Sequence, residues 1–317
     1  MKHILVIGDA FVDRYIYGRA TRLSPEAPVA VLQYDRETAS PGGAGNTAYA
    51  VKRLGGVARI VAVCGGPSHG GSSLADVTYD HGIPVRDMVR SEGRGAQIKT
   101  RFITDSGGAH QLLRVDREKT GPYSEDTQRQ IHKAVQHAMI GAGFVVVSDY
   151  AKGLINRDLM EVVYREARRI NAPVLVDPKP VNVSCYRGTC DIVAPNRAEL
   201  AEYVKRRLAT VQDIEAAAID MGSDLGAHTI FAKADRLGAV VATRLGLHPV
   251  VWDTHHFETT AKNVIDVTGA GDVAVAAFAV GCMQHDMNLA HAAKFAMKAA
   301  AVAVSNSGTY CPKAEEV

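Results

Sequence analysis

Short runs of β-branched residues alternate with amphipathic stretches along most of the chain, and this alternation limits the possible folds more than any other feature. Between several runs, apolar residues recur at helical spacing, as in Ala44–Leu54 and Leu159–Ile170. The predicted buried strands are Ile4–Ile7, Ile60–Val63, Val145–Val147, Val174–Val176, Ile192–Ala194, Ile230–Phe231 and Val240–Ala242. The pattern predicts an α/β fold, in which helices cover both faces of a mostly parallel sheet. Ligands of such sheets bind at the carboxyl ends of the strands.

Two segments interrupt this alternation, residues 15–38 and residues 84–117. They contain the strand-like pieces Val29–Gln33, Arg101–Thr104 and Leu112–Val115 without helices between them. We therefore expect a small, mostly antiparallel sheet that stands off the main one. It can serve as a lid over a site, or as an edge extension or dimer surface, and both roles are compatible because an exposed sheet face needs burial.

Composition and the chain ends narrow the class of protein. With 317 residues, 47% of them hydrophobic, the chain can build one α/β domain over residues 1–317. A net charge of +2 argues against nucleic acid or a membrane as the main partner. The first apolar run is short and Asp9 follows it, so we expect a cytoplasmic protein, in which the five Cys stay reduced. The polar tail Tyr310–Val317 predicts a loosely held end.

The motif that carries chemistry is Asp266–Asp272, with the sequence DVTGAGD, followed by small apolar residues. It predicts a strand ending near Val264–Asp266, then a Gly-Ala-Gly turn and a helix. Glycines let a phosphate approach the backbone, and the first helical amides point at it with the helix dipole behind them. A carboxylate at Asp272 would accept a proton from an attacking hydroxyl. The alternative is that Asp272 only caps the helix.

Three further motifs favour binding of a polar ligand. Pro41–Asn46 (PGGAGN) opens a predicted helix, and its glycines and Asn46 suit contact with sugar hydroxyls, although a tight turn with an Asn cap would have the same residues. Asp149–Gly153 (DYAKG) and Asp177–Lys179 (DPK) each place an Asp and a Lys directly after a predicted strand. Such strand ends are where a site is expected.

Asn196 and Glu199 lie three residues apart at the start of another predicted helix. Their oxygens could order the water shell of Mg²⁺, which prefers oxygen ligands and keeps several waters. The same pair also fits a capping box, in which both side chains bond to backbone amides. One pair can serve both purposes.

The PGGAGN and DVTGAGD segments resemble the two signatures of the ribokinase-like, phosphofructokinase-B-type sugar kinases, and the resemblance runs from Ile4 to about Thr309. Gly8–Gly18, Arg22–Val29 and Gln111–Asp116, with SDYAKG and VDPKP, are similar to D-glycero-β-D-manno-heptose 7-phosphate kinases. The resemblance implies a three-layer ribokinase-like fold with a β-sheet lid, use of ATP and Mg²⁺, and a homodimer joined through the lid. It also implies phosphorylation of heptose 7-phosphate at C1, toward ADP-heptose for surface polysaccharide.

The resemblance further implies roles for individual residues. Asp272 resembles the catalytic base, and the amides of three residues resemble the anion hole, namely Gly269, Ala270 and Gly271. The residues expected to hold the sugar hydroxyls are Asp13, Gly42, Gly43 and Asn46, and those expected near the sugar phosphate are Arg14, Arg114, Asp149, Lys152 and Lys179. The residues expected near nucleotide and Mg²⁺ are Asn196, Glu199, Lys233, Gly238 and Asn306. Asp266 and Thr268 resemble the element that often holds a monovalent cation such as K⁺.

Several departures from the family pattern keep other readings open. Val273 stands where most members have Thr or Ser, and Ala232–Gly238 replaces a hydroxyl-bearing loop near the nucleotide. The HxGH motif of an adenylyltransferase is absent, so we expect the stand-alone kinase form. The alternatives are a kinase for another sugar or sugar phosphate and a catalytically silent regulator, and the intact GAGD argues against the regulator. A P-loop kinase is excluded because GxxxxGK[ST] does not occur.

Overall fold

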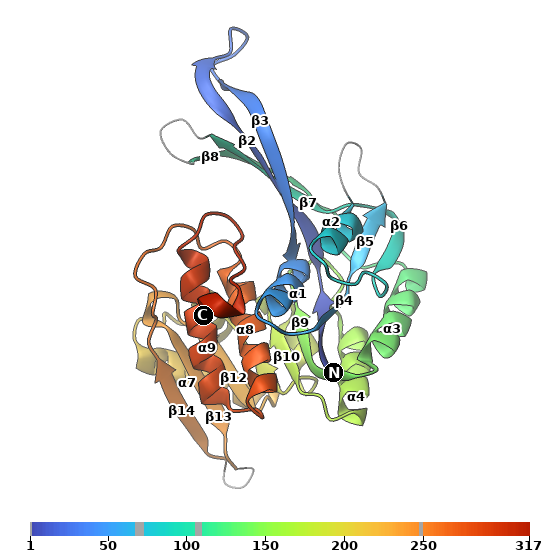
Figure 1. Cartoon of the computed structure of the whole chain (residues 1–317). Helices are drawn as coiled ribbons and strands as arrows, with labels where there is room; N and C mark the ends of the chain where they lie inside the picture. The colour runs from blue at the N-terminus through green and yellow to red at the C-terminus, as the bar shows by residue number, and fades with distance from the viewer. Residues whose placement is uncertain (1, 67–72, 105–109, 247–249) are drawn as a thin grey trace.

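A wide central sheet with a second sheet rising from it dominates the computed structural model, which describes residues 2–66, 73–104, 110–246 and 250–317 (Figure 1). In this part of the chain the central sheet has eight strands in the order β14-β13-β12-β11-β10-β9-β1-β4. Its strands are His3–Gly8 (β1), Ala58–Val61 (β4), Ala142–Ser148 (β9), Val174–Asp177 (β10), Ile192–Val193 (β11), Thr229–Lys233 (β12), Ala239–Arg244 (β13) and Trp252–Phe257 (β14). Neighbours are parallel except at β12–β13 and β13–β14. The predicted, mostly parallel α/β sheet is confirmed.

Both faces of the sheet are buried, which explains why its strands are continuous apolar runs. In β1, Ile4 and Val6 belong to one core cluster, whereas Leu5 and Ile7 belong to the cluster on the opposite face. Parallel strands covered by helices on two sides carry this pattern because both sets of alternating side chains need apolar neighbours.

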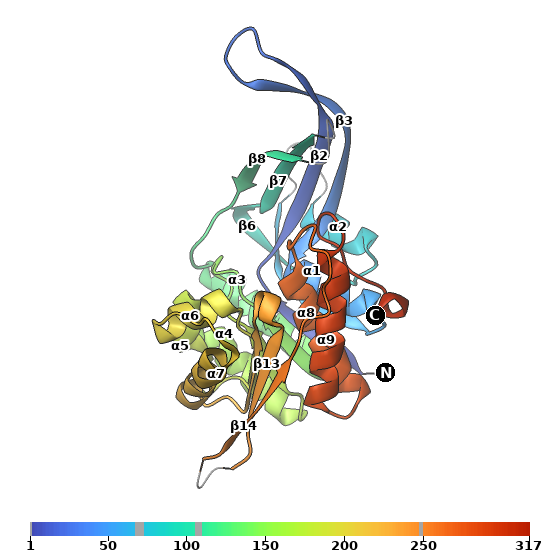
Figure 2. The ribbon, with the colours of Figure 1, turned by 90° about the vertical axis from the view of Figure 1, so that its left-hand side faces the viewer.

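Two groups of helices supply those neighbours. Ala44–Arg53 (α1), Leu74–Asp80 (α2), Ala270–Gln284 (α8) and Leu289–Val304 (α9) bury residues in the first cluster. Glu125–Met139 (α3), Arg157–Arg169 (α4), Val183–Tyr186 (α5), Arg197–Val204 (α6) and Val211–Leu225 (α7) bury residues in the second. Short 3₁₀ turns occupy Pro180–Asn182, Asp235–Leu237 and Ala314–Glu316. Figure 2, a quarter turn from Figure 1, shows α9 and α7 on opposite sides of β13.

The lid sheet stands away from the helices at one edge of the molecule (Figures 1 and 2). Its described strands are Ala10–Leu23 (β2), Ala30–Gly43 (β3), Ile98–Thr104 (β7) and His110–Arg117 (β8), in the order β3-β2-β7-β8. β2 and β7 are parallel, and the other two pairs are antiparallel. The two long strands β2 and β3 continue down to the central sheet, so the site lies at their base.

The lid differs from the predicted ranges at its second segment. Residues 89–95 form β6 (Val89–Gly95), which pairs with β5 (Val63–Gly66) in a separate sheet, so this part of 84–117 is not lid. Residues 105–109 of the predicted lid lie outside the described residues.

The strand expected near Val264–Asp266 is wrong. Val264 and Ile265 are about two-thirds exposed, and the amides of Ile265 and Asp266 donate to Val304 O at 2.7 and 3.2 Å. This segment therefore lies against the C-terminal end of α9 as a loop, and no strand pairs with it among the described residues. β-branched composition alone suggested a strand, but the side chains that would need burial face outward.

The position of α8 depends on a glycine. Gly269 precedes the helix at φ +77°, and a Cβ there would lie 2.5 Å from Thr309 Cγ2. From Asp272 to Cys282 the helix is buried on every side. Among the described helices, none combines the length and apolar character needed to cross a lipid bilayer.

We expect Phe278→Ala to test how far α8 depends on its contact with the sheet. The Phe278 ring stacks on Phe231 of β12, with centroids 4.4 Å apart, and both side chains are fully buried. The substitution should lower the free energy of unfolding in urea by about 3–5 kcal/mol, since it removes a large side chain from a packed core. Tyr79→Ala, at an exposed residue of α2, is the control. Equal losses in the two variants would contradict this view of the core.

Candidate active site

The site lies where the direction of the chain reverses across the central sheet. β1 is flanked by β4, the edge strand of the described sheet, on one side and by β9 on the other, and β10 to β14 continue outward from β9. Such a reversal leaves a crevice at the carboxyl ends of the two central strands. A cavity of about 160 Å³ opens there. Of the predicted residues, six line it: Asp13, Gly43, Arg114, Thr268, Gly269 and Asp272. Five unpredicted residues also line it: Phe11, Lys99, Arg101, Tyr150 and Thr309.

The carboxyl group of Asp272 is held from two sides at the start of α8. Asn46 Nδ2 donates to one carboxylate oxygen at 2.9 Å, and the Tyr150 hydroxyl donates to the other at 2.7 Å. Thr47 Oγ1 lies 3.4 Å from the second oxygen. Because α1 supplies Asn46 and Thr47 while the loop after β9 supplies Tyr150, two separate elements fix this side chain.

Burial raises the pKa of Asp272 from 3.8 to about 7, and the neighbouring charge of Asp177 acts in the same direction. The bonds from Asn46 and Tyr150, and the ammonium of Lys233, lower the pKa and so partly oppose burial. A carboxyl group with a pKa near neutrality is suited to receive a proton and release it again. A plain helix cap would not need this environment.

The C-terminal segment takes part in the site, so the expectation of a loosely held tail is wrong. Cys311 is buried, and its thiol donates to Asn46 Oδ1 at 3.2 Å. Arg53 Nε donates to the carbonyl of Cys311 at 3.1 Å. With its oxygen engaged by Cys311, the Asn46 amide presents its NH₂ group to Asp272. The polar composition of the tail gives no indication of the buried contact between Cys311 and Asn46.

Lid strands bring cations over the cavity. Asp13 of β2 forms an ion pair with Arg101 of β7, and Asp13 is aligned with Lys99 in the parallel pairing of the two strands. Lys99 Nζ lies 2.8 Å from Glu118, and Arg114 Nε lies 2.9 Å from Asp116. Arg114 remains about half exposed, so its guanidinium can also meet a ligand.

The other predicted sugar-phosphate residues do not line the cavity. Arg14 pairs with Glu37 within the lid at 2.5 Å, because it follows Asp13 and points to the opposite face of β2. Lys152 is paired with Glu118. Asp149 is fully buried and accepts hydrogen bonds from Tyr186, Asn182 and the Ala151 amide, so its role is to shape the loop after β9. Gly42, which was expected to hold sugar hydroxyls, does not line the cavity either and packs against Phe11 and Asp13.

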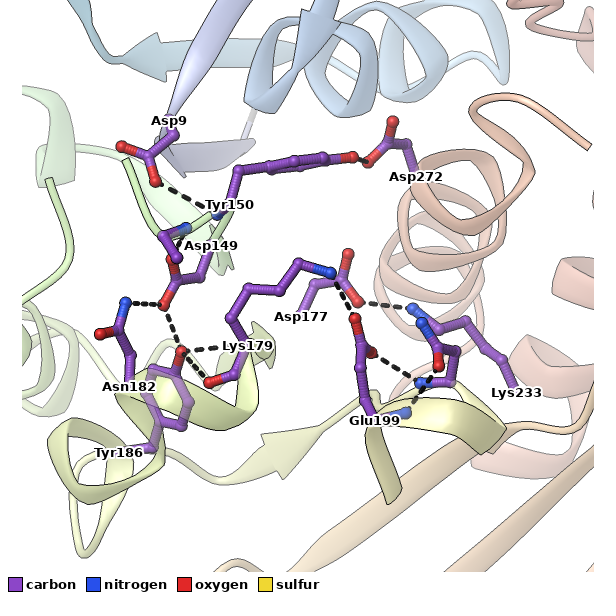
Figure 3. Close-up of polar contacts among 12 residues, drawn as sticks. Asp9, Asp149, Tyr150, Asp177, Lys179, Asn182, Tyr186, Glu199, Lys233 and Asp272 are labelled. Atoms are coloured by element: carbon purple, nitrogen blue, oxygen red, sulfur yellow. Dashed lines mark hydrogen bonds and ion pairs between the residues drawn. The ribbon is translucent and has the colours of Figure 1, made fainter. Parts of the chain in front are cut away.

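A second polar cluster lies beside Asp272, at the ends of β10, β11 and β12 (Figure 3). Lys233 Nζ lies 2.5 Å from Asp177, and Lys179 Nζ lies 2.5 Å from Glu199. Asn196 and Glu199 form the predicted capping box, with both reciprocal bonds at 2.9 Å. The pairing with Glu199 places Lys179 in this cluster, away from the lid cations. A Cβ on Gly271 would lie 3.9 Å from Lys233 Nζ, which places this ammonium next to the first turn of α8.

The remaining predicted residues lie around the loop before α8. Asp266 accepts hydrogen bonds from the amides of Thr268 at 2.9 Å and Gly308 at 3.0 Å, and so joins this loop to the end of α9. Of the predicted anion-hole amides, that of Ala270 donates to Val267 O at 3.2 Å. Asn306 donates to Val302 O within the last turn of α9. Gly238 ends a 3₁₀ turn at φ +88°.

A wider hollow of about 450 Å³ lies beside these residues. One wall is α9, through Lys298, Ala301, Val302 and Ser305, and the facing wall is the loop 260–263. Ser305 on its wall follows Val304, whose carbonyl accepts the amide of Asp266, so the hollow lies next to the loop that carries Asp266.

Some of the unpredicted site residues left a signal in the sequence. Lys99 and Arg101 alternate on β7, as residues that share one face of a strand do, but a strand gives no sign of which face meets a ligand. Tyr150 lies between the Asp and the Lys of DYAKG, where the two charged residues, and not the phenol, are the ones that the sequence predicts to bind a ligand. Cys311 left no signal that a single sequence reveals.

Comparison with solved structures places the fold among sugar kinases. Phosphofructokinase-2 from Escherichia coli in complex with potassium aligns with a TM-score of 0.78 and 20% identity, covering 100% of this chain and 97% of that one. Arabidopsis thaliana ribokinase complexed with ribose and ATP aligns with a TM-score of 0.73 and 19% identity, covering 99% and 97%. At these identities the likeness shows the fold, and it is ribokinase-like with a lid sheet, as predicted.

Comparison with protein families and curated proteins identifies the class of protein. Residues 1–315 match the pfkB family of carbohydrate kinases, and the chain belongs to that family. Among curated proteins, bifunctional protein HldE of Hyphomonas neptunium is 37% identical over 320 residues, covering 100% of this chain and 63% of the relative. HldE of Acidiphilium cryptum is 35% identical over 318 residues, covering 99% and 62%. The chain thus spans a little over six-tenths of the length of these relatives.

The raised pKa of Asp272 predicts how Asp272→Asn changes thermal stability. Folding favours the protonated carboxyl, so its stabilising contribution is complete below about pH 4 and is lost as pH rises through about 7. Asparagine carries no ionisable proton. The melting temperature of the variant minus that of the wild type should therefore rise between these pH values, as measured by scanning calorimetry.

Asp213→Asn provides a control whose melting-temperature difference from the wild type should stay flat between these pH values. Asp213 is an exposed capping residue whose pKa is lowered, chiefly by the Thr210 amide, so its contribution is present above its ordinary pKa and is lost as pH falls. A melting-temperature difference for Asp272→Asn that stays flat across the same range would contradict the raised pKa.

Proposed function

We propose that this kinase transfers the γ-phosphoryl group of ATP to the C1 hydroxyl of D-glycero-β-D-manno-heptose 7-phosphate, giving the 1,7-bisphosphate used in ADP-heptose synthesis. One observation carries the proposal: a buried carboxyl, Asp272, faces the same small cavity as the lid cations Lys99, Arg101 and Arg114. The resemblance of DYAKG, DPK and the N-terminal segment to heptose 7-phosphate kinases supports the choice of sugar, as do the HldE relatives.

The cavity has two chemically different parts, which suit a sugar phosphate. Asp272 accepts the proton of the attacking hydroxyl, and its pKa of about 7 allows it to be ionised in a large fraction of molecules at neutral pH. Asp13 accepts hydrogen bonds from sugar hydroxyls, and Arg101 fixes its orientation. Arg114 and Lys99 neutralise an anionic substituent held under the lid, because each can exchange its carboxylate partner for a phosphate.

Glu199 and Asn196 are suited to Mg²⁺ that enters with ATP. Bound Mg²⁺-ATP supplies the phosphoryl group and offsets its charge. The oxygens of Glu199 already accept one bond each, yet a carboxylate has further lone pairs for metal-bound water. Lys233 and the first-turn amides of α8 lie beside Asp272 and would stabilise charge on the transferring group. The hollow between α9 and residues 260–263 has room for a nucleotide base.

Asp266 fits a monovalent cation in the same way. Each of its oxygens accepts one backbone amide, so lone pairs remain for an ion such as K⁺ between this loop and the end of α9.

We further propose a homodimer through the lid, because β8 carries the exposed apolar residues Leu112, Leu113 and Val115. Sedimentation velocity of the wild type and Leu113→Glu measures this; a monomeric wild type would contradict it.

Turnover on matched substrates tests the proposed function. With Mg²⁺-ATP, the wild type should release ADP on D-glycero-β-D-manno-heptose 7-phosphate and much more slowly on ribose, fructose or fructose 6-phosphate. Asp272→Asn should lower kcat by at least about 10²-fold, the usual contribution of a positioned base. Preference for another sugar would keep the carbohydrate kinase and remove the heptose assignment.

Comparison of two cation variants tests where the substrate phosphate lies. Arg114→Ala should raise KM for the sugar phosphate about tenfold or more, since it removes a charged hydrogen bond. Lys179→Ala should have a smaller effect on that KM, because Lys179 is paired with Glu199 in the neighbouring cluster. The reverse order of effects, measured by steady-state kinetics, would place the phosphate at Lys179.

A further inference from the structure

Among the described residues, the Tyr150 hydroxyl donates the shortest hydrogen bond to Asp272, at 2.7 Å. The loop that carries Tyr150 is itself held by several hydrogen bonds. Asp9, at the end of β1, is buried and accepts the backbone amides of Tyr150, Lys152 and Leu154 at 3.1, 2.9 and 3.2 Å. Ala151 adopts φ +54° and Gly153 φ +106°, a tight path that these bonds hold in place. One carboxylate thus fixes the loop over three alternate residues.

The Tyr150 ring is also held. It meets Phe11 edge-on, with centroids 5.4 Å apart and planes at 78°, and the Lys179 ammonium lies 5.7 Å from its centroid. Figure 3 shows the ring extending from the loop toward Asp272, with the phenol at its tip. Burial, followed by the charge of Asp272, raises the pKa of Tyr150 well above its usual value, so the phenol keeps its proton and acts as the donor. Tyr150 therefore reaches the base as a donor of fixed direction.

We propose that Tyr150 is a positioning residue for the base: its hydroxyl holds one oxygen of Asp272 in place and stabilises the ionised carboxylate, leaving the remaining lone pairs for the substrate hydroxyl. This rests on the proposed role of Asp272. Asn46 fixes the other oxygen, so the two donors come from different elements, α1 and the loop after β9. Other charged or titratable groups surround Asp272. Asp13, Lys99, Arg101 and Arg114 of the lid line the same cavity, and the charges of Asp177 and Lys233 at strand ends act on Asp272. Lys179 lies against the Tyr150 ring, and Cys311 bonds to Asn46.

Tyr150→Phe tests the proposal because it removes only the hydroxyl. The acid limb of the kcat profile should move up by about one pH unit, since a hydrogen bond to a charged group is lost. Activity at pH 7 should then fall about fivefold, and the deficit should shrink at higher pH. KM for the sugar should change little. Tyr203→Phe is the matched control, because that hydroxyl donates to Asp224 and neither residue lines the cavity, so its loss should leave the limb in place.

Two measurements keep the test independent of folding defects and of the sugar. Site-specific 3-fluorotyrosine at position 150 keeps the ring and makes the phenol a stronger donor, so the limb should move to lower pH. A ¹³C NMR titration of Asp272 without substrate, assigned through Asp272→Asn, should show the same two shifts of opposite sign. Failure of the heptose assignment would leave this titration unchanged.

The proposal would be overturned if the midpoint of the Asp272 titration were the same in both position-150 variants as in the wild type. A uniform loss of activity across pH would also overturn it, since Tyr150 would then only shape the cavity. A rise in KM with an unmoved limb would instead make the phenol a contact of the substrate, and this too would overturn it.

Discussion

Burial of the Asp272 carboxyl against the sheet is the interaction on which the site depends. An uncompensated carboxylate in such a position is costly, and the raised pKa of about 7 records that cost. It is tolerated because Asn46 and Tyr150 each donate a hydrogen bond to it. The surrounding elements are arranged to deliver these donors: α1 supplies one, and the loop after β9 supplies the other.

This convergence follows from the topology of a parallel sheet. Because β1, β9, β10, β11 and β12 run in the same direction, the residues that follow them meet at one edge. Polar residues occupy those positions, while the strands are apolar on both faces. The lid grows from the same edge, since β2 follows β1 directly and carries Asp13 over the cavity. A buried carboxyl, cations and the lid over them are thus assembled from segments far apart in the sequence.

Features that depend on local pattern could be predicted from the sequence. The α/β alternation, the helix that follows Gly269 and the capping box of Asn196 and Glu199 are all confirmed. The strand near Val264 was wrong because β-branched composition does not say whether a neighbouring strand exists. The polar composition of the tail predicts a loosely held end, but the buried thiol of Cys311 holds the tail against Asn46.

Partnerships between side chains were the part that the sequence could not provide. Arg14, Lys152 and Lys179 were expected near a phosphate because they are cations beside signature residues, but each is paired with a carboxylate outside the cavity. Lys99 and Arg101 reach the cavity through the register of β2 and β7, which only the folded lid defines. Tyr150 acquires its importance from the 2.7 Å contact with a residue 122 positions away.

The central claim is that Asp272 meets the hydroxyl that is phosphorylated, with the sugar phosphate held under the lid. A crystal structure with heptose 7-phosphate and a non-hydrolysable ATP analogue measures this directly. The account predicts the C1 oxygen within hydrogen-bond distance of Asp272, about 2.6–3.2 Å, and the 7-phosphate in contact with Arg114 or Lys99. A bound sugar whose hydroxyls all lie beyond reach of Asp272, or whose phosphate contacts Lys179 instead, would contradict it.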